Sequence, residues 1–163
     1  MSRRVRVASL EEVLQKTQVV LCAALANPSY RLESIPIAPK QEASPERFPA
    51  FTRCICRYLV EEVISSSSSK TPKPGEEIEV SGPAWRYELA IYKKRYLEGL
   101  NKITLHTEYR PTGSDGALDN DKLILFLRYQ SRDGWTFAYP NSVEHPQLRP
   151  KVEALLQQRR PRR

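Results

Sequence analysis

The segment that most constrains the fold is KLILFLRYQSRDGWTFAYP, residues 122–140. The five apolar residues of Leu123–Leu127 predict a strand covered on both faces, because a half-exposed strand would alternate apolar and polar side chains. Asp133-Gly134 is a typical hairpin turn. The returning strand has three alternating aromatic residues, Trp135, Phe137 and Tyr139. The segment therefore predicts a β-hairpin that is packed within a sheet.

Further segments have the apolar run or the alternation of a β-strand. They are residues 19–26, 51–64, 75–80 and 103–110. In the third of these, Ile78 and Val80 are expected to point inward, with Glu77 and Glu79 outward. Asn27-Pro28 is expected to end the first strand. A short edge strand is expected at 31–37.

Three helices are expected. Ser9 and Glu12 have the spacing of a capping box, which predicts a short helix at 10–17. A second helix is expected at about 84–99, inserted between two strands, because apolar residues recur there at helical spacing. These residues are Trp85, Leu89, Tyr92 and Tyr96. The same kind of spacing predicts a C-terminal helix at 146–158.

The connections are rich in proline, with thirteen prolines against six glycines. Residues 29–50 indicate a long Pro-rich surface loop, and the serine run of 65–75 indicates a mobile linker between two strands. A chain of 163 residues is long enough to bury one core without disulfides or metals. We therefore expect a single domain at 9–158, between basic tails at 1–8 and 159–163.

The formal net charge of +7 is concentrated at the two ends of the chain. Nine of the 26 Lys and Arg residues lie in 1–6 and 149–163, whereas 7–148 holds 17 basic and 18 acidic residues. Basic tails can bind phosphate backbones or acidic surfaces without reading a sequence, and they also serve solubility. The charge therefore leaves nucleic-acid binding open without requiring it.

The sequence predicts a cytoplasmic protein. Residues 1–16 have neither the apolar run nor the small-residue cleavage site of a signal peptide. The longest apolar run, Val19–Ala26, is too short for a membrane span. Three cysteines, an odd number, indicate reduced thiols rather than a disulfide framework.

Two cysteines, Cys54 and Cys56, lie one residue apart in the strand expected at 51–64. Alternation places both sulfurs on one face, about 7 Å apart along the strand, which is too far for a relaxed disulfide. A zinc site would need two more ligands, and Cys22, His106 and His145 lack the spacing of a metal motif. We therefore expect inward-facing, reduced thiols and neither a metal nor a cofactor.

No set of catalytic residues can be assembled from the sequence. His106 could act as a general base beside a carboxylate, but nothing places a nucleophile next to it. The acidic residues Asp115, Asp119 and Asp121 lack the ligand spacing of an EF-hand. The sequence contains no P-loop, dinucleotide-binding or nucleophile-elbow motif. The expectation is that the protein is not an enzyme.

Residues 9–139 resemble a group of poorly characterised bacterial β-barrel domains related to the netrin and tissue-inhibitor-of-metalloproteinase version of the OB barrel. The matching pieces are LEEVLQKTQVVLCA, TRCICRYLVEEV, PGEEIEV and KLILFLRYQSRDGWTFAY. The resemblance implies an α+β, mainly antiparallel fold: an OB-like barrel of five to six strands with a short N-terminal helix, an inserted helix and a C-terminal helix. The inhibitory wedge of the metalloproteinase inhibitors has no matching residues here, so no activity is implied.

The inserted helix and the residues just after it carry the candidate binding site. Its basic and aromatic residues are Arg86, Tyr87, Lys93, Lys94, Arg95 and Lys102. Such a surface can bind an acidic protein groove, or a phosphate backbone with the tyrosines stacked on bases. Tyr92 and Tyr96 lie on the apolar stripe and are expected to pack onto the barrel.

The leading hypothesis is a cytoplasmic, non-catalytic binding module whose inserted helix and Pro-rich loop recognise a protein partner, as in an immunity protein or a small adaptor. The alternative is a nucleic-acid-binding OB-type domain in which the basic tails and residues 86–102 follow a phosphate backbone. The sequence leaves the oligomeric state open.

Overall fold

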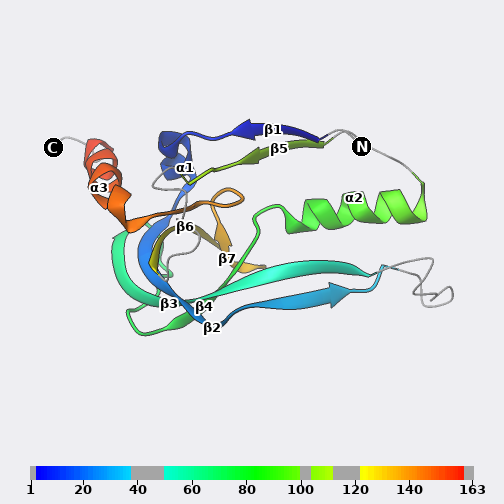
Figure 1. Ribbon diagram of the computed structural model, residues 1–163, viewed down its shortest axis with the longest axis horizontal. Helices are drawn as coiled ribbons and strands as arrows, with labels where there is room; N and C mark the ends of the chain where they lie inside the picture. The colour runs from blue at the N-terminus through cyan, green and yellow to red at the C-terminus, as the bar shows by residue number, and fades with distance from the viewer. Residues whose placement is uncertain (1–2, 38–49, 100–103, 112–121, 160–163) are drawn as a thin grey trace.

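The computed structural model describes residues 3–37, 50–99, 104–111 and 122–159. These residues form an α+β fold with a mostly antiparallel six-stranded sheet, a separate two-stranded sheet and three α-helices (Figure 1). The α+β class expected from the sequence is therefore confirmed.

The main sheet is built from strands that lie far apart in the sequence. Its order is β2 (Val19–Ile35), β3 (Phe51–Ser66), β4 (Glu77–Ser81), β7 (Gly134–Phe137), β6 (Lys122–Gln130) and β8 (Val143–Glu144). Neighbouring strands are antiparallel, except that β4 and β7 are parallel. The first residues of β2 also pair with β6, so that β2 lies between β3 and β6.

The strand β2 differs from its prediction. It continues through Asn27-Pro28, which was expected to end it, and the edge strand expected at 31–37 is its second half. The register between β2 and β3 shifts between Leu25 and Tyr30. This irregularity accommodates the proline, which cannot donate a ladder hydrogen bond. Beyond it, the two strands form a long hairpin that extends from the rest of the sheet (Figure 1).

The predicted hairpin of residues 122–140 is confirmed, with β6 and β7 joined at a turn where Gly134 has φ 73°. Both faces of β6 are covered, as expected. Leu123, Leu125 and Leu127 belong to a first core cluster that also contains the inward-facing Ile78 and Val80 of β4. The intervening Ile124 and Phe126 belong to a second core cluster on the opposite face. The unbroken apolar run is therefore explained by two packed layers.

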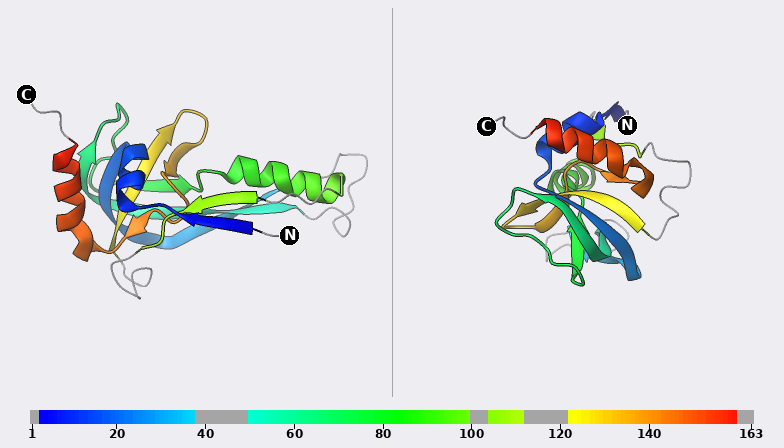
Figure 2. Two further views of the ribbon diagram at one scale, coloured as in Figure 1. Left: turned by 90° about the horizontal axis from the view of Figure 1, so that it is seen from above. Right: turned by 90° about the vertical axis from the view of Figure 1, so that its left-hand side faces the viewer.

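Helices α1 and α3 cover the second core cluster. In α1 (Leu10–Lys16) the expected capping box is present, with the Glu12 amide donating to the Ser9 hydroxyl over 3.2 Å. A 3-10 turn at Pro146–Leu148 leads into α3 (Arg149–Gln158), which buries Val152 completely. Both helices lie at the same end of the molecule (Figure 2).

The remaining elements lie on the other side of the molecule (Figures 1 and 2). Strand β1 (Arg3–Val7) pairs in parallel with β5 (Thr104–Glu108), and helix α2 (Trp85–Leu97) runs beside β5. The segment expected as a basic tail at 1–8 therefore contains a strand. Within the described residues, no helix has the length and apolar character needed to cross a membrane.

The connection expected as a mobile linker at 65–75 is built differently. Its first two serines belong to β3, and the Ser67 amide donates to the carbonyl of Gln18 over 2.8 Å. Further along, the Gly75 amide donates to the carbonyl of Val60, also over 2.8 Å. The segment joins β3 to β4, as expected, and these bonds tie both of its ends to the sheet.

Candidate binding cleft between helix α2 and strand β5

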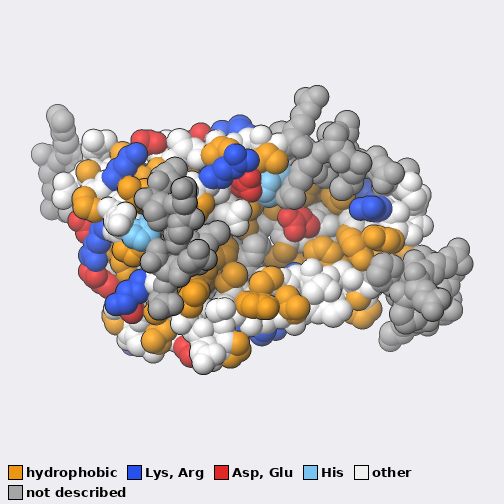
Figure 3. Space-filling view, viewed as in Figure 1, with side chains coloured by type: hydrophobic (Ala, Val, Ile, Leu, Met, Phe, Trp, Pro, Cys, Tyr) orange, Lys and Arg blue, Asp and Glu red, His pale blue; other side chains and the backbone are white. Residues whose placement is uncertain are grey.

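A cleft of about 460 Å³ lies between α2 and β5. Its residues come from α1, the two residues before α2, α2 itself, β5 and the segment that follows β7. In the space-filling view, hydrophobic side chains gather along α2 and the strands below it (Figure 3). A volume of this size is within the range of pockets that bind small molecules or the side chains of a partner.

Two aromatic contacts hold α2 against the sheet and so define one wall of the cleft. At its first residue, the Trp85 ring lies 3.9 Å from the guanidinium carbon of Arg53 on β3 and 4.3 Å from that of Arg86. One turn before its last residue, Tyr92 packs edge-on against Phe51, with ring centroids 5.4 Å apart. The Tyr92 hydroxyl also donates to the carbonyl of Ala50 over 3.2 Å, which fixes the helix along β3.

The floor of the cleft is apolar and its rim is mostly cationic. The floor contains Ala138 and Tyr139, both buried, and Ile91 of α2 faces the same space. Lys16 places its ammonium group 4.9 Å from the centroid of the Tyr139 ring, and Arg95 lines the opposite wall. With Glu88 as the carboxylate among the lining residues, the cleft suits an apolar side chain that is flanked by acidic groups.

The wall on the β5 side contains His106 and Thr107. His106 lies with its Nε2 3.7 Å from Oε2 of Glu108, and both side chains are largely buried. Glu108 also accepts hydrogen bonds from Arg110 and from Asn141. The imidazole is therefore held beside a carboxylate that other donors keep in place, and no serine or cysteine is found among the described residues that line the cleft.

Burial changes the acidity of one phenol at the cleft. The pKa of Tyr92 is raised, first because the hydroxyl is partly desolvated and second because Tyr96 lies beside it. The two rings are 4.5 Å apart. Tyr92 therefore stays protonated at neutral pH and remains a hydrogen-bond donor.

The predicted binding residues separate into two groups. Tyr87, which is 57% exposed, and Arg95 both line the cleft. Arg86 points elsewhere and binds the carboxylate of Asp133 over 2.7 and 2.9 Å. Lys93 and Lys94 are not among the lining residues. Lys102 lies outside the described residues, as do the acidic residues of the loop at 112–121.

Several lining residues were not identified from the sequence. These residues come from three separate segments, and strand pairing between residues about a hundred positions apart in the sequence brings two of the segments together. They are Lys16, Thr107, Tyr139 and Pro140. His106 was considered only as a possible base. The one sequence feature that pointed toward the cleft was the apolar spacing of α2. This spacing indicated that one face of the helix is packed, but it did not indicate which segments lie next to the other faces.

The cysteines differ in part from the prediction. Cys54 is exposed, and this corrects the expectation that both thiols point into the core. Cys56 packs against the first core cluster, and burial, with a smaller contribution from Cys54, raises its pKa to about 11. The pair lies on the hairpin just where β3 leaves the core, so the first sulfur reaches solvent. Burial also raises the pKa of Cys22.

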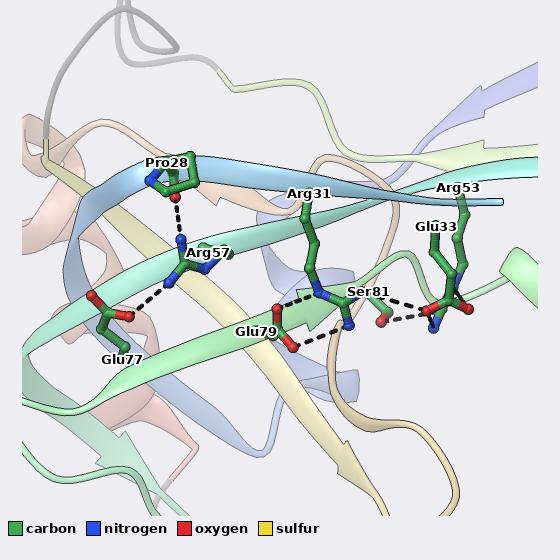
Figure 4. A network of polar contacts seen from close by, with 8 residues as sticks. All are labelled: Pro28, Arg31, Glu33, Arg53, Arg57, Glu77, Glu79 and Ser81. Atoms are coloured by element: carbon green, nitrogen blue, oxygen red, sulfur yellow. Dashed lines mark hydrogen bonds and ion pairs between the residues drawn. The ribbon is translucent and has the colours of Figure 1, made fainter.

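A second polar surface lies on the outer faces of β2, β3 and β4 (Figure 4). Three arginines there are matched by carboxylates. Arg31 binds Glu79 with its Nε at 2.6 Å, Arg53 binds Glu33 at 3.3 Å, and Arg57 binds Glu77 at 2.9 Å. The Arg57 guanidinium also donates to the carbonyl of Pro28 at the β2 irregularity. This surface is thus charge-compensated by its own side chains.

Among the described residues, no group of three or more His, Cys, Asp or Glu side chains could hold a metal ion. Comparison with protein-family models, with curated proteins and with solved structures finds no significant match to the chain.

Proposed function

We propose that the chain is a cytoplasmic, non-catalytic binding module with an OB-like barrel core, and that the cleft between α2 and β5 receives an extended segment of a protein partner. An immunity protein or a small adaptor has this kind of role. The observation that carries the proposal is an apolar cleft bordered by an edge of β5 that pairs with no other strand of the described residues.

The strand pairings support the OB-like core. Five strands pair in the order β2-β3-β4-β7-β6, and β6 pairs back with β2. The pair β4 and β7 is parallel, whereas the other pairs of this ring are antiparallel. The first core cluster draws on all five strands. An OB barrel is likewise a five-stranded, partly open Greek-key barrel.

The edge of β5 supports the binding of an extended peptide. The carbonyl of Glu108 accepts from the Ala8 amide over 2.8 Å, so Glu108 directs its backbone groups toward β1. Because successive residues of a strand direct these groups to opposite sides, the amide and carbonyl of Thr107 point away from β1. In the described parts of the chain, β5 pairs with no other strand.

Thr107 also lines the cleft, so the open edge of β5 and the apolar floor border the same space. A peptide that adds a strand at this edge gains backbone hydrogen bonds, and it can place alternate side chains toward Ile91 and Tyr139. The cations Lys16 and Arg95 favour acidic residues in that peptide.

Nucleic-acid binding is the second candidate, supported by the exposed Tyr87 and Tyr96 on a helix that also contains Arg95. In OB domains, oligonucleotides bind the face of the second and third strands, which correspond here to β3 and β4. On that face Arg57 and Arg31 are already paired with carboxylates. A phosphate backbone would have to displace those carboxylates, and the protein partner is therefore the leading proposal.

The experiment compares affinity purification of the parent protein with that of I91E, which places a carboxylate in the apolar cleft. The matched control is L32E, because Leu32 is 62% exposed on the hairpin, away from the cleft lining. The parent and L32E should each retain one partner at equal stoichiometry, and I91E should lose it. Circular dichroism checks that both variants are folded. Retention of the partner by folded I91E would contradict the proposal.

A salt series tests the second candidate. If the basic ends and α2 bind single-stranded or duplex oligonucleotides, the logarithm of the binding constant should fall steeply with the logarithm of the salt concentration. Absence of oligonucleotide binding at low salt would exclude nucleic-acid binding and would not affect the proposal of a protein partner.

A further inference from the structure

Three buried polar atoms have no hydrogen-bond partner within the described chain: the indole Nε1 of Trp85, Nε of Arg128 and the hydroxyl of Thr136. Trp85 is 9% exposed and Thr136 is 1% exposed. The first two atoms can only donate, and the hydroxyl can donate as well. Unmet donors in such positions are costly, and their grouping therefore requires a reason.

Strand register places two of the three residues, Arg128 and Thr136, in one row, and Arg53 links this row to Trp85. Arg128 on β6 lies directly opposite Thr136 on β7, and Thr136 lies opposite Ser81 on β4. Residues directly opposite one another share a face of the sheet. Arg53 donates to the Ser81 hydroxyl over 3.2 Å and lies against the Trp85 ring. The row thus runs across three strands and ends beneath the first residue of α2.

The start of α2 adds donors at the same place. Ala84 is the N-cap residue of this 13-residue helix, and no side chain caps it. The first amides of an α-helix have no partner within the helix, and its dipole makes this end partially positive. Trp85 is the first residue of α2, so it belongs to the same helical turn as the uncapped amides.

The charges around the row leave one cation uncompensated. Arg53 is paired with Glu33 and Arg86 with Asp133. Arg128, by contrast, has neither an ion pair nor a hydrogen bond within the part of the chain that the structure describes. Since Arg128 is half-buried, the row reaches the surface at its end.

We propose that this row is an oxyanion-binding site, in which a carboxylate or a phosphate accepts hydrogen bonds from Trp85, Arg128 and Thr136. Each unmet atom is a donor, the local charge is positive, and the helix end favours an anion. The site lies beneath the start of α2 and does not depend on the partner proposed for the cleft.

The experiment follows the fluorescence of Trp85 in a W135F background, where it is the one remaining tryptophan. Inorganic phosphate and acetate are titrated separately, with sodium chloride used to hold the ionic strength constant. The expected result is a saturable change in emission together with a higher thermal unfolding midpoint. Binding of phosphate indicates a phosphate ligand, and binding of acetate alone indicates a carboxylate.

R128Q removes the uncompensated cation, and R132Q is its control because Arg132 is an exposed arginine in the adjoining turn. R128Q should weaken binding by about tenfold or more, the factor expected for one charged hydrogen bond, whereas R132Q should not change it. T136V keeps the shape of the buried side chain and should also weaken binding. It provides the test if R128Q does not fold. No saturable response to either anion, or an equal response in the folded variants, would overturn the proposal.

Discussion

Replacing Trp85 by alanine should cost much more stability than replacing it by phenylalanine. The side chain is 91% buried and lies between the guanidinium groups of Arg53 and Arg86. Removing about 200 Å² of buried apolar surface gives an upper bound of about 5 kcal/mol. Trp→Ala substitutions in protein cores typically lower the free energy of unfolding by about 3–5 kcal/mol, which does not exceed this bound. These values already include the cost of the cavity that the substitution leaves. We therefore expect W85A to lose about 4 kcal/mol.

W85F should lose less than about 1.5 kcal/mol, because phenylalanine keeps an aromatic face between the two guanidinium groups. It also removes the unpaired indole N–H, and this loses no hydrogen bond within the described chain. Urea unfolding followed by far-UV circular dichroism gives both values by linear extrapolation. Hydrogen exchange should show α2 opening first in W85A, with α1 and α3 still protected. Equal losses in the two variants, or less than about 1.5 kcal/mol for W85A, would refute the docking role of Trp85.

Three further predictions concern the thiols and the helical layer. In the native protein an alkylating reagent should modify the exposed Cys54 well before the partly buried Cys56, whose pKa is raised to about 11; similar rates would contradict this difference in burial. Stability should fall as pH rises from 9 to 11, because burial raises the pKa values of Cys56 and Tyr58 in the folded state, so that the unfolded state loses these protons first. Thermal melts of C56A should show a smaller fall. V152A should lose about 2–3 kcal/mol in urea unfolding because this side chain of α3 is fully buried in the second core cluster, whereas V5A, at 44% exposure, should lose less than about 0.5 kcal/mol.

Local patterns were enough to predict most of the elements. The apolar run of Leu123–Leu127 and the turn at Asp133-Gly134 defined β6 and β7, and the capping box defined α1. Each of these depends on residues that are neighbours in the sequence. The outcome differs at Asn27-Pro28, where a local stop signal is overridden because β3 pairs with β2 on both sides of the proline.

The cleft could be predicted less well. Tyr87 and Arg95 were identified because they lie on a basic and aromatic helix, but nothing local indicates that Thr107 or Tyr139 faces them. The exposure of Cys54 has the same origin. Alternation correctly placed Cys54 on the same face of β3 as Cys56. The residue at which the core ends along β3, however, depends on β4, on α2 and on the length of β2.

The parallel pairing of β1 with β5 has a consequence for the order in which the molecule assembles. Arg3 lies opposite Thr104, so one wall of the cleft joins segments about a hundred residues apart. Closing so long a loop is entropically costly, and the resulting two-stranded ribbon has no third strand among the described elements to reward it. We expect this ribbon to form late during synthesis and to open early during unfolding. A partner strand added to β5 would thus extend this ribbon and would also help to complete its folding.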